Sequence, residues 1–186
     1  MGRRINRSAG IGWRRGKPWC GTTRPSITMT KRFLEFVPFI FKWEGGYDND
    51  PDDPGGETKY GIDRRSHPGV DIKALTRDGA LQIYWCDYWL KHGCDDLVRP
   101  LGEVFFNACV NCGAGRARKI LRVARTAAGF LDEQEAFYRR LVKGRPALRK
   151  YLKGWLNRTG DLRGVVGLGD GTNGTDGTNG TDMGKV

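Results

Sequence analysis

The segment 101–112, which reads LGEVFFNACVNC, constrains the fold more than any other part of this 186-residue chain. Its residues are nearly all apolar, among them Val104, Phe105, Ala108 and Cys109. A helix that is apolar around most of its circumference must be covered on all sides. We therefore expect this helix at the centre of a core that other helices enclose.

Amphipathic patterns on both sides of that segment supply the enclosing helices. Apolar residues recur at helical spacing in 30–42, where Pro38 should bend the helix, and in 76–91, for which Thr76 is a suitable N-cap. Three further helices are expected at 113–128, 131–143 and 146–156.

The region 47–72 breaks this pattern because it is rich in Gly, Pro and Asp. Such a composition predicts a loop, and the order of residues around 59–62 favours a short β-hairpin within it. The predicted fold is mainly α: a helical domain with a small loop and β-hairpin lobe.

Both ends of the chain differ from this helical middle. Residues 1–28 are rich in Gly and Arg and show no periodicity, so we expect a disordered basic leader and consider Met29 as the true start. Residues 165–186 contain a repeated Gly-Thr-Asn-Gly-Thr-Asp unit that cannot bury a core, so a flexible tail is expected there.

The net charge of +11 is unevenly placed, since residues 116–163 hold fourteen basic and four acidic residues. A basic face of this kind favours an anionic partner, such as a wall polymer or a membrane surface; the alternative is a solvated helical surface. No nucleic-acid recognition motif accompanies the charge, so no specific nucleic acid is expected.

The sequence also limits how the chain can meet a membrane. Its longest aromatic-apolar run, 33–43, is interrupted by Glu35, Pro38 and Lys42 and is too short to span a bilayer. The N-terminus lacks the apolar stretch of a secretory signal. We expect synthesis in the cytoplasm without a signal peptide.

Five cysteines in a chain without an export signal are expected to be reduced thiols. Cys109 and Cys112 have the spacing of a zinc-ligand pair, but their candidate partners, Cys86 and Cys94, are separated by seven residues. Cys109 also falls on an apolar helical face, where cysteine acts as a small hydrophobe. We expect no metal and no other cofactor.

Glu44 carries the sharpest chemical signal in the chain. It lies between Trp43 and Tyr47, at the end of the first predicted helix, which Gly45 and Gly46 should stop. Desolvation by the aromatic neighbours and the negative end of the helix dipole both disfavour an ionised carboxyl group. Glu44 is therefore expected to hold a proton and to act as the general acid that glycosidic cleavage requires.

A second carboxyl group must stay ionised, and the turn 52–62 offers one. Asp53 is expected in polar surroundings, Thr58 has a hydroxyl that can hold a water, and Gly56 allows the backbone to stay low beneath a polysaccharide. Two other interpretations stay open for this region. It can be a solvated acidic loop, or a calcium site, although the Gly and Glu positions of an EF-hand loop are not matched.

Longer motifs in the same region resemble the glycoside hydrolase family 108 muramidases, which include phage endolysins and secretion-associated lysozymes. The motifs are Glu-Gly-Gly-Tyr at 44–47, Asp-Asp-Pro-Gly-Gly-x-Thr-x-x-Gly-Ile at 52–62, Leu-Thr at 75–76, Ile-Tyr at 83–84, Tyr-Trp at 88–89 and Val-Asn-x-Gly at 110–113. The likeness runs from about Lys31 to Leu121.

This resemblance implies a lysozyme-like catalytic domain at 29–125 that hydrolyses the β-1,4 bond between N-acetylmuramic acid and N-acetylglucosamine in peptidoglycan. The residues it implies are Glu44, Asp53 and Thr58 for catalysis, and Tyr47, Gly56, Tyr60 and Asn111 for substrate binding. It also implies action in the periplasm or cell wall, after release by a holin or a secretion system. We expect a monomer.

Residues 126–164 resemble a shortened form of the peptidoglycan-binding region with which family members usually continue. The stretches 137–141 and 153–158 resemble its last two helices, whereas an Asp-Gly-x-x-Gly-Pro-x-Thr turn is missing before Leu131. A second departure is Asn107, where the family commonly has Asp. We interpret Asn107 as a structural position.

Two other functions stay open at this point. One is a non-catalytic, basic protein on the same fold that binds the cell wall or a membrane. The other is a lytic transglycosylase, which also uses a single glutamate but releases products with 1,6-anhydro ends.

Overall fold

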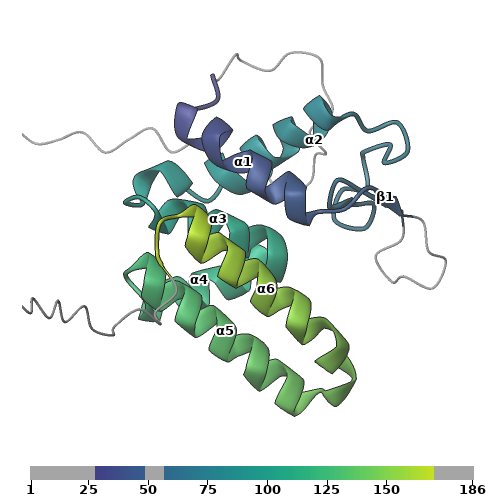
Figure 1. Ribbon diagram of the computed structural model, residues 1–186. Coiled ribbons are helices and arrows are strands. Elements are labelled where there is room, and N and C mark those ends of the chain that lie inside the picture. Colours follow the sequence, from purple (N-terminus) through teal and green to yellow (C-terminus); the bar gives the residue numbers. More distant parts are fainter. Residues whose placement is uncertain (1–27, 49–56, 170–186) are drawn as a thin grey trace, which may run out of the picture. The chain divides into compact units, whose positions relative to one another are not determined.

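The computed structural model describes residues 28–48 and 57–169 (Figure 1). Contacts divide them into two units, one made mainly of residues 44–77 and one made of residues 29–43 and 78–169. The predicted leader and repeat tail fall almost entirely outside the described residues. Helices dominate, and a small antiparallel sheet accounts for the strands, so the predicted mainly α class is confirmed.

The larger unit consists of helices. In chain order they are α1 (Lys31–Trp43), α2 (Arg77–Ile83), the π-helix η1 (Tyr84–Leu90), the 3-10 helix η2 (Cys94–Asp96), α3 (Leu101–Ala108), the π-helix η3 (Cys109–Gly113), α4 (Ala114–Val123), α5 (Ala127–Gly144), the 3-10 helix η4 (Pro146–Leu148) and α6 (Arg149–Val165). No helix within the described ranges is both long and apolar enough to cross a bilayer.

Helix α3 forms the centre of this unit, as its composition predicts. Every residue of α3 is buried, and the helix packs against α1, α4 and α5. Phe106 has ring contacts with Phe33 at 5.9 Å and with Trp89 at 5.3 Å between centroids. Aromatic packing of this kind supplies a large buried apolar area, which explains why a helix with so little polar surface is stable here.

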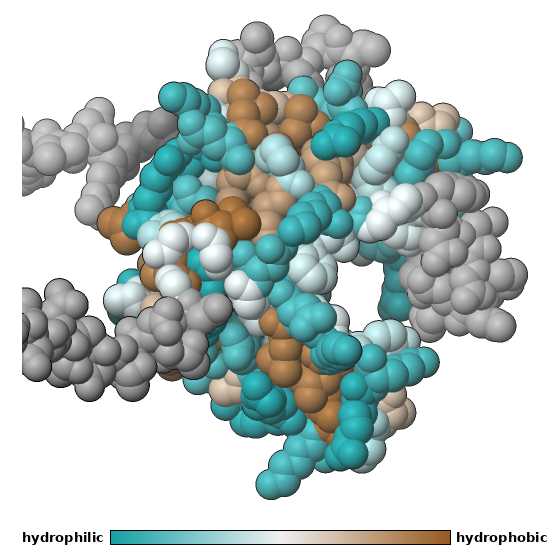
Figure 2. Space-filling model, in the orientation of Figure 1, coloured by the Kyte–Doolittle hydropathy of each residue, from teal (hydrophilic) through white to brown (hydrophobic). Residues whose placement is uncertain are grey.

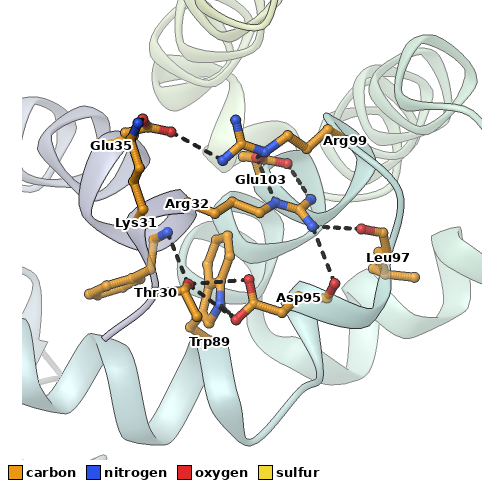
Figure 3. A network of polar contacts seen from close by, with 10 residues as sticks. Thr30, Lys31, Arg32, Glu35, Trp89, Asp95, Leu97, Arg99 and Glu103 are labelled. Atoms are coloured by element: carbon orange, nitrogen blue, oxygen red, sulfur yellow. Dashed lines mark hydrogen bonds and ion pairs between the residues drawn. The ribbon is translucent and has the colours of Figure 1, made fainter. Parts of the chain in front are cut away.

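Helix α1 begins where Thr30 supplies an N-cap. The Thr30 hydroxyl accepts a hydrogen bond from the Phe33 amide at 3.3 Å, which satisfies one of the free N–H groups of the first turn. The same hydroxyl lies 3.2 Å from each carboxylate oxygen of Asp95, which also accepts from Trp89 Nε1 at 2.7 Å. These contacts attach the start of α1 to the segment before α3 (Figure 3).

A buried ion pair attaches the next residue of α1 directly to α3. Arg32 donates from Nε to Glu103 at 2.8 Å and from Nη2 at 2.5 Å, and its Nη1 donates to the Leu97 carbonyl at 2.7 Å. Gly102 leaves room for this guanidinium, since a Cβ atom there would lie 2.3 Å from Arg32 Nη2 and from the Cys94 carbonyl oxygen. Figure 3 shows the contacts of Arg32 with Glu103 and with the Leu97 carbonyl.

Several helices differ from their predicted forms. The stretch expected as one helix at 76–91 changes from α2 to the π-helix η1, in which Tyr84, Trp85 and Trp89 are all buried. Wider π-turns are local insertions in the 3.6-residue repeat, so periodicity does not reveal them. Helix α6 continues nine residues beyond the predicted end at 156, because Leu162 is fully buried against the rest of the unit.

The smaller unit contains a three-stranded antiparallel sheet in the order β1-β2-β3. Its strands are β1 (Tyr47–Asp48), β2 (Thr58–Lys59) and β3 (Ile62–Asp63). Tyr60 and Gly61, with φ values of 53° and 72°, form the two-residue turn between β2 and β3. The hairpin predicted at 59–62 is thus confirmed, whereas β1, which pairs Asp48 with Thr58, was not foreseen.

Candidate active site

Glu44 is the first residue after helix α1, as the sequence predicts. Helix α1 ends at Trp43, and Glu44 lies in a bend with a partly exposed side chain. Gly45 and Gly46 follow and are exposed. The carboxyl group therefore directly follows the end of an amphipathic helix rather than lying within a long loop.

The end of α1 is held by a residue from the last helix. The Asp161 carboxylate in α6 accepts from Lys42 Nζ at 2.7 Å and from Trp43 Nε1 at 2.8 Å, both at Oδ2. The hydrogen bond from Lys42, followed by that from Trp43, lowers the pKa of Asp161 below its ordinary value. Asp161 thus anchors the two residues that precede Glu44.

Asp161 is a residue that sequence reasoning missed. It is separated from Trp43 by 118 positions and lies in a helix of low amphipathicity, so neither spacing nor periodicity indicates the contact. The only signal in the sequence is that Asp161 is the single acid of a strongly basic helix.

The sheet brings together three of the predicted site positions. Thr58 in β2 is paired with Asp48, and the neighbouring pair joins Tyr47 to Lys59, so Tyr47 and Thr58 lie on adjacent strands. Tyr60 follows in the turn, and the Lys59 ammonium lies 5.7 Å from the centre of its ring. The side chains of Thr58 and Tyr60 are partly exposed. Asp53 and Gly56 lie outside the described residues, and their roles stay predictions.

A second carboxylate in this unit has a structural partner. Glu57 forms an ion pair with Arg64, and the Arg64 amide also donates to the Glu57 carbonyl at 3.0 Å. The Glu57 side chain is only 11% exposed. This ion pair joins the start of β2 to the segment after β3, so Glu57 stabilises the hairpin.

Asn111, predicted to bind substrate, belongs to the larger unit. It lies in the π-helix η3, and its Oδ1 accepts a hydrogen bond from the Tyr138 hydroxyl. That hydroxyl accepts in turn from Gln134 Nε2 at 2.6 Å. Burial raises the pKa of Tyr138, which keeps its hydroxyl protonated as the donor to Asn111. Asn111 is therefore held in one orientation by α5.

Asn107 is a buried structural position. Its side chain is 0% exposed at the end of α3, and its Oδ1 accepts from Arg158 Nε of α6 at 2.8 Å. Its Nδ2 is a buried donor without a hydrogen-bond partner in the described part of the chain. The amide thus satisfies one side of the contact with Arg158 and leaves its own N–H group unused.

The cysteines are not arranged as a metal site in the described ranges. No three Cys, His, Asp or Glu side chains come together there in a way that could hold a metal ion. Burial raises the pKa of Cys112 to about 11 and that of Cys109 to about 12, so both thiols stay protonated near neutral pH. The four-cysteine zinc alternative therefore gains no support, and the calcium alternative depends on residues outside these ranges.

Comparison with known proteins identifies a family and a solved structure to which this chain is similar. Residues 37–113 match the model of the family described as glycosyl hydrolase 108. Among solved structures, the chain is similar to Brucella abortus SagA, with a TM-score of 0.59 and 27% sequence identity over 75% of this chain and 97% of that chain. No curated protein matches the chain.

The match over this segment and the similar solved structure support the class of glycoside hydrolase. The family whose model the segment 37–113 matches is glycosyl hydrolase 108. The resemblance seen in the motifs is thereby confirmed. The matched segment contains Glu44 and the whole sheet, and it ends at the last residue of η3.

Proposed function

We propose that this chain is an N-acetylmuramidase that cleaves the β-1,4 bond between N-acetylmuramic acid and N-acetylglucosamine in peptidoglycan, with Glu44 as the general acid. The observation that carries the proposal is the position of Glu44. It lies inside the family segment, directly after α1, where Asp161 anchors the two preceding residues. A general acid must be held in fixed geometry against the leaving oxygen, and this anchor favours such a role.

In the proposed reaction, Glu44 donates its proton to the glycosidic oxygen while the bond from that oxygen to the anomeric carbon breaks. Water supplies the hydroxyl group that joins the anomeric carbon, and its proton passes to a carboxylate. We assign that carboxylate to Asp53 and the orientation of the water to Thr58. Exchange with solvent then returns the proton to Glu44 and removes the one from Asp53.

The substrate contacts are assigned to Tyr47, Gly56, Tyr60 and Asn111. We further propose that the enzyme acts as a monomer in the periplasm or cell wall, after release by a holin or a secretion system. Its basic C-terminal helices would add affinity for an anionic wall polymer or membrane surface.

The test is clearing of a peptidoglycan zymogram by a Glu44→Gln variant. The amide keeps the size of the side chain but cannot donate an acidic proton, so clearing should be lost while the circular dichroism spectrum stays unchanged. Glu35→Gln is the matched control, since Glu35 lies in helix α1, which Glu44 directly follows, and pairs with Arg99 at the surface. Retained clearing by Glu44→Gln would refute the assignment.

Mass spectrometry of the released fragments separates the reaction types. Reducing ends support hydrolysis, whereas 1,6-anhydro ends would identify a lytic transglycosylase. A non-catalytic wall-binding protein would release no fragments at all.

A further inference from the structure

The turn between the last two long helices concentrates positive charge. We call residues 139–155 the basic tip; it comprises the end of α5, η4 and the start of α6. Its sequence, RRLVKGRPALRKYLKGW, contains no acidic residue. Helices α5 and α6 run side by side to this tip (Figure 1).

Most of these charges are not neutralised by the protein. Arg140 pairs with Glu133 at 2.6 Å. Within the described ranges, the other basic residues of the tip have exposed side chains and no ion pair; they are Arg139, Lys143, Arg145, Arg149, Lys150 and Lys153. An exposed cluster of one sign attracts a polyanion over about a Debye length.

Aromatic and apolar side chains are interleaved with these cations. Trp155 of α6 stacks on Tyr138 of α5, with ring centroids 5.1 Å apart and an interplanar angle of 28°. It also stacks on Tyr151, with centroids 5.9 Å apart and an angle of 29°. Tyr151 is 48% exposed, and Leu148 and Leu152 are half-buried. Figure 2 shows a short hydrophobic strip bordered by hydrophilic residues over the lower part of α5 and α6.

The geometry of the aromatic rings discriminates among polyanions. A single-stranded nucleic acid would stack its bases on open ring faces, and a glycan would lay its sugars against them. Trp155 instead has two nearly parallel neighbours, and the Lys150 ammonium lies 5.0 Å from the centre of the Tyr151 ring. The rings are therefore engaged with one another and with a cation, which leaves less open ring face for stacked bases or sugars.

A layer of anionic lipid headgroups can instead be bound by cations that lie on its surface and by amphipathic side chains whose ring edges enter the layer. Tyr and Trp are enriched at this depth, and Lys and Arg bind anionic headgroups. We propose that the basic tip docks on the surface of a membrane that contains anionic phospholipid. This docking is independent of the reaction at Glu44.

The experiment measures partitioning of the full chain onto vesicles of phosphatidylcholine, alone or mixed with phosphatidylglycerol. The test variant combines Arg149→Gln, Lys150→Gln and Lys153→Gln. Each cation at an anionic surface strengthens partitioning about five-fold, so the triple change should weaken binding on the order of 100-fold. Binding to phosphatidylcholine alone should be weak for every variant.

The matched control removes the same charge from another helix, through Lys119→Gln, Arg122→Gln and Arg125→Gln in and after the exposed face of α4. The proposal expects this control to bind mixed vesicles much better than the tip variant, while both keep the circular dichroism spectrum of the unchanged protein. An equal loss of vesicle binding in both variants would mean that net charge alone determines binding, and it would overturn the proposal. Failure of the unchanged protein to bind mixed vesicles, or preferential binding to a wall polymer or single-stranded DNA, would also overturn it.

Discussion

Replacement of Asn107 by aspartate is expected to stabilise the fold. Asn107 is fully buried, and its Oδ1 accepts from Arg158 Nε at 2.8 Å, while its Nδ2 has no hydrogen-bond partner among the described residues. A carboxylate has nearly the same shape, removes the unused donor and places a negative charge beside a guanidinium that is only 4% exposed.

The size of the effect follows from three opposing contributions. Burial of a carboxylate costs several kcal/mol, and its attraction to a guanidinium about 4 Å away recovers roughly 4 kcal/mol at an effective dielectric constant of about 20. These contributions nearly cancel. Removal of a buried unsatisfied donor, worth about 1–3 kcal/mol, then decides the sign. We expect the free energy of unfolding to rise by about 1–2 kcal/mol.

Urea unfolding at pH 7 measures this difference in the free energy of unfolding. An unchanged slope of that free energy against urea concentration would indicate that the two folded states are alike. The control is the same Asn107→Asp change in an Arg158→Met background, where the carboxylate lacks its counter-charge and should destabilise. A decrease in stability at pH 7 would refute the reasoning.

Two further predictions concern α6 and the buried thiols. The pKa of Asp161 is lowered in the folded state, so the stabilisation that it provides is present above about pH 3.8 and is lost at lower pH. Asp161→Asn should therefore lower the free energy of unfolding in urea by up to about 1 kcal/mol at pH 7. The difference between the two proteins should vanish in acid. Cys109 and Cys112 should resist alkylation at pH 8 in the folded protein and react only after unfolding, which mass spectrometry can follow; rapid labelling of either would show that it is accessible.

The sequence predicted those parts of the fold that depend on local pattern. The apolar segment 101–112 indicated the central helix because such a segment has no stable solvent-exposed alternative. The hairpin at 59–62 was predictable because Gly61 suits the left-handed backbone of its turn. Glu44 was placed correctly at the end of α1, since the two glycines after it disfavour continuation of the helix.

The parts that escaped prediction depend on contacts between distant residues. The anchor from Asp161 joins residues that no local pattern relates, and the burial of Leu162 that extends α6 exists only after the helices pack. Strand β1 has two residues, too few for alternation to be visible, and it is defined by its partner β2. The catalytic roles of Asp53 and Thr58 remain predictions.

The anchor on Trp43 also has a consequence for the timing of folding. Asp161 follows Trp43 by 118 residues, so at about 5–20 residues per second the ribosome adds this partner roughly 6–24 s after it has made α1. Until then Lys42 and Trp43 have no Asp161 to bind, and the end of helix α1 is free of this constraint. Glu44 is thus made well before one of the residues that hold the end of the helix preceding it.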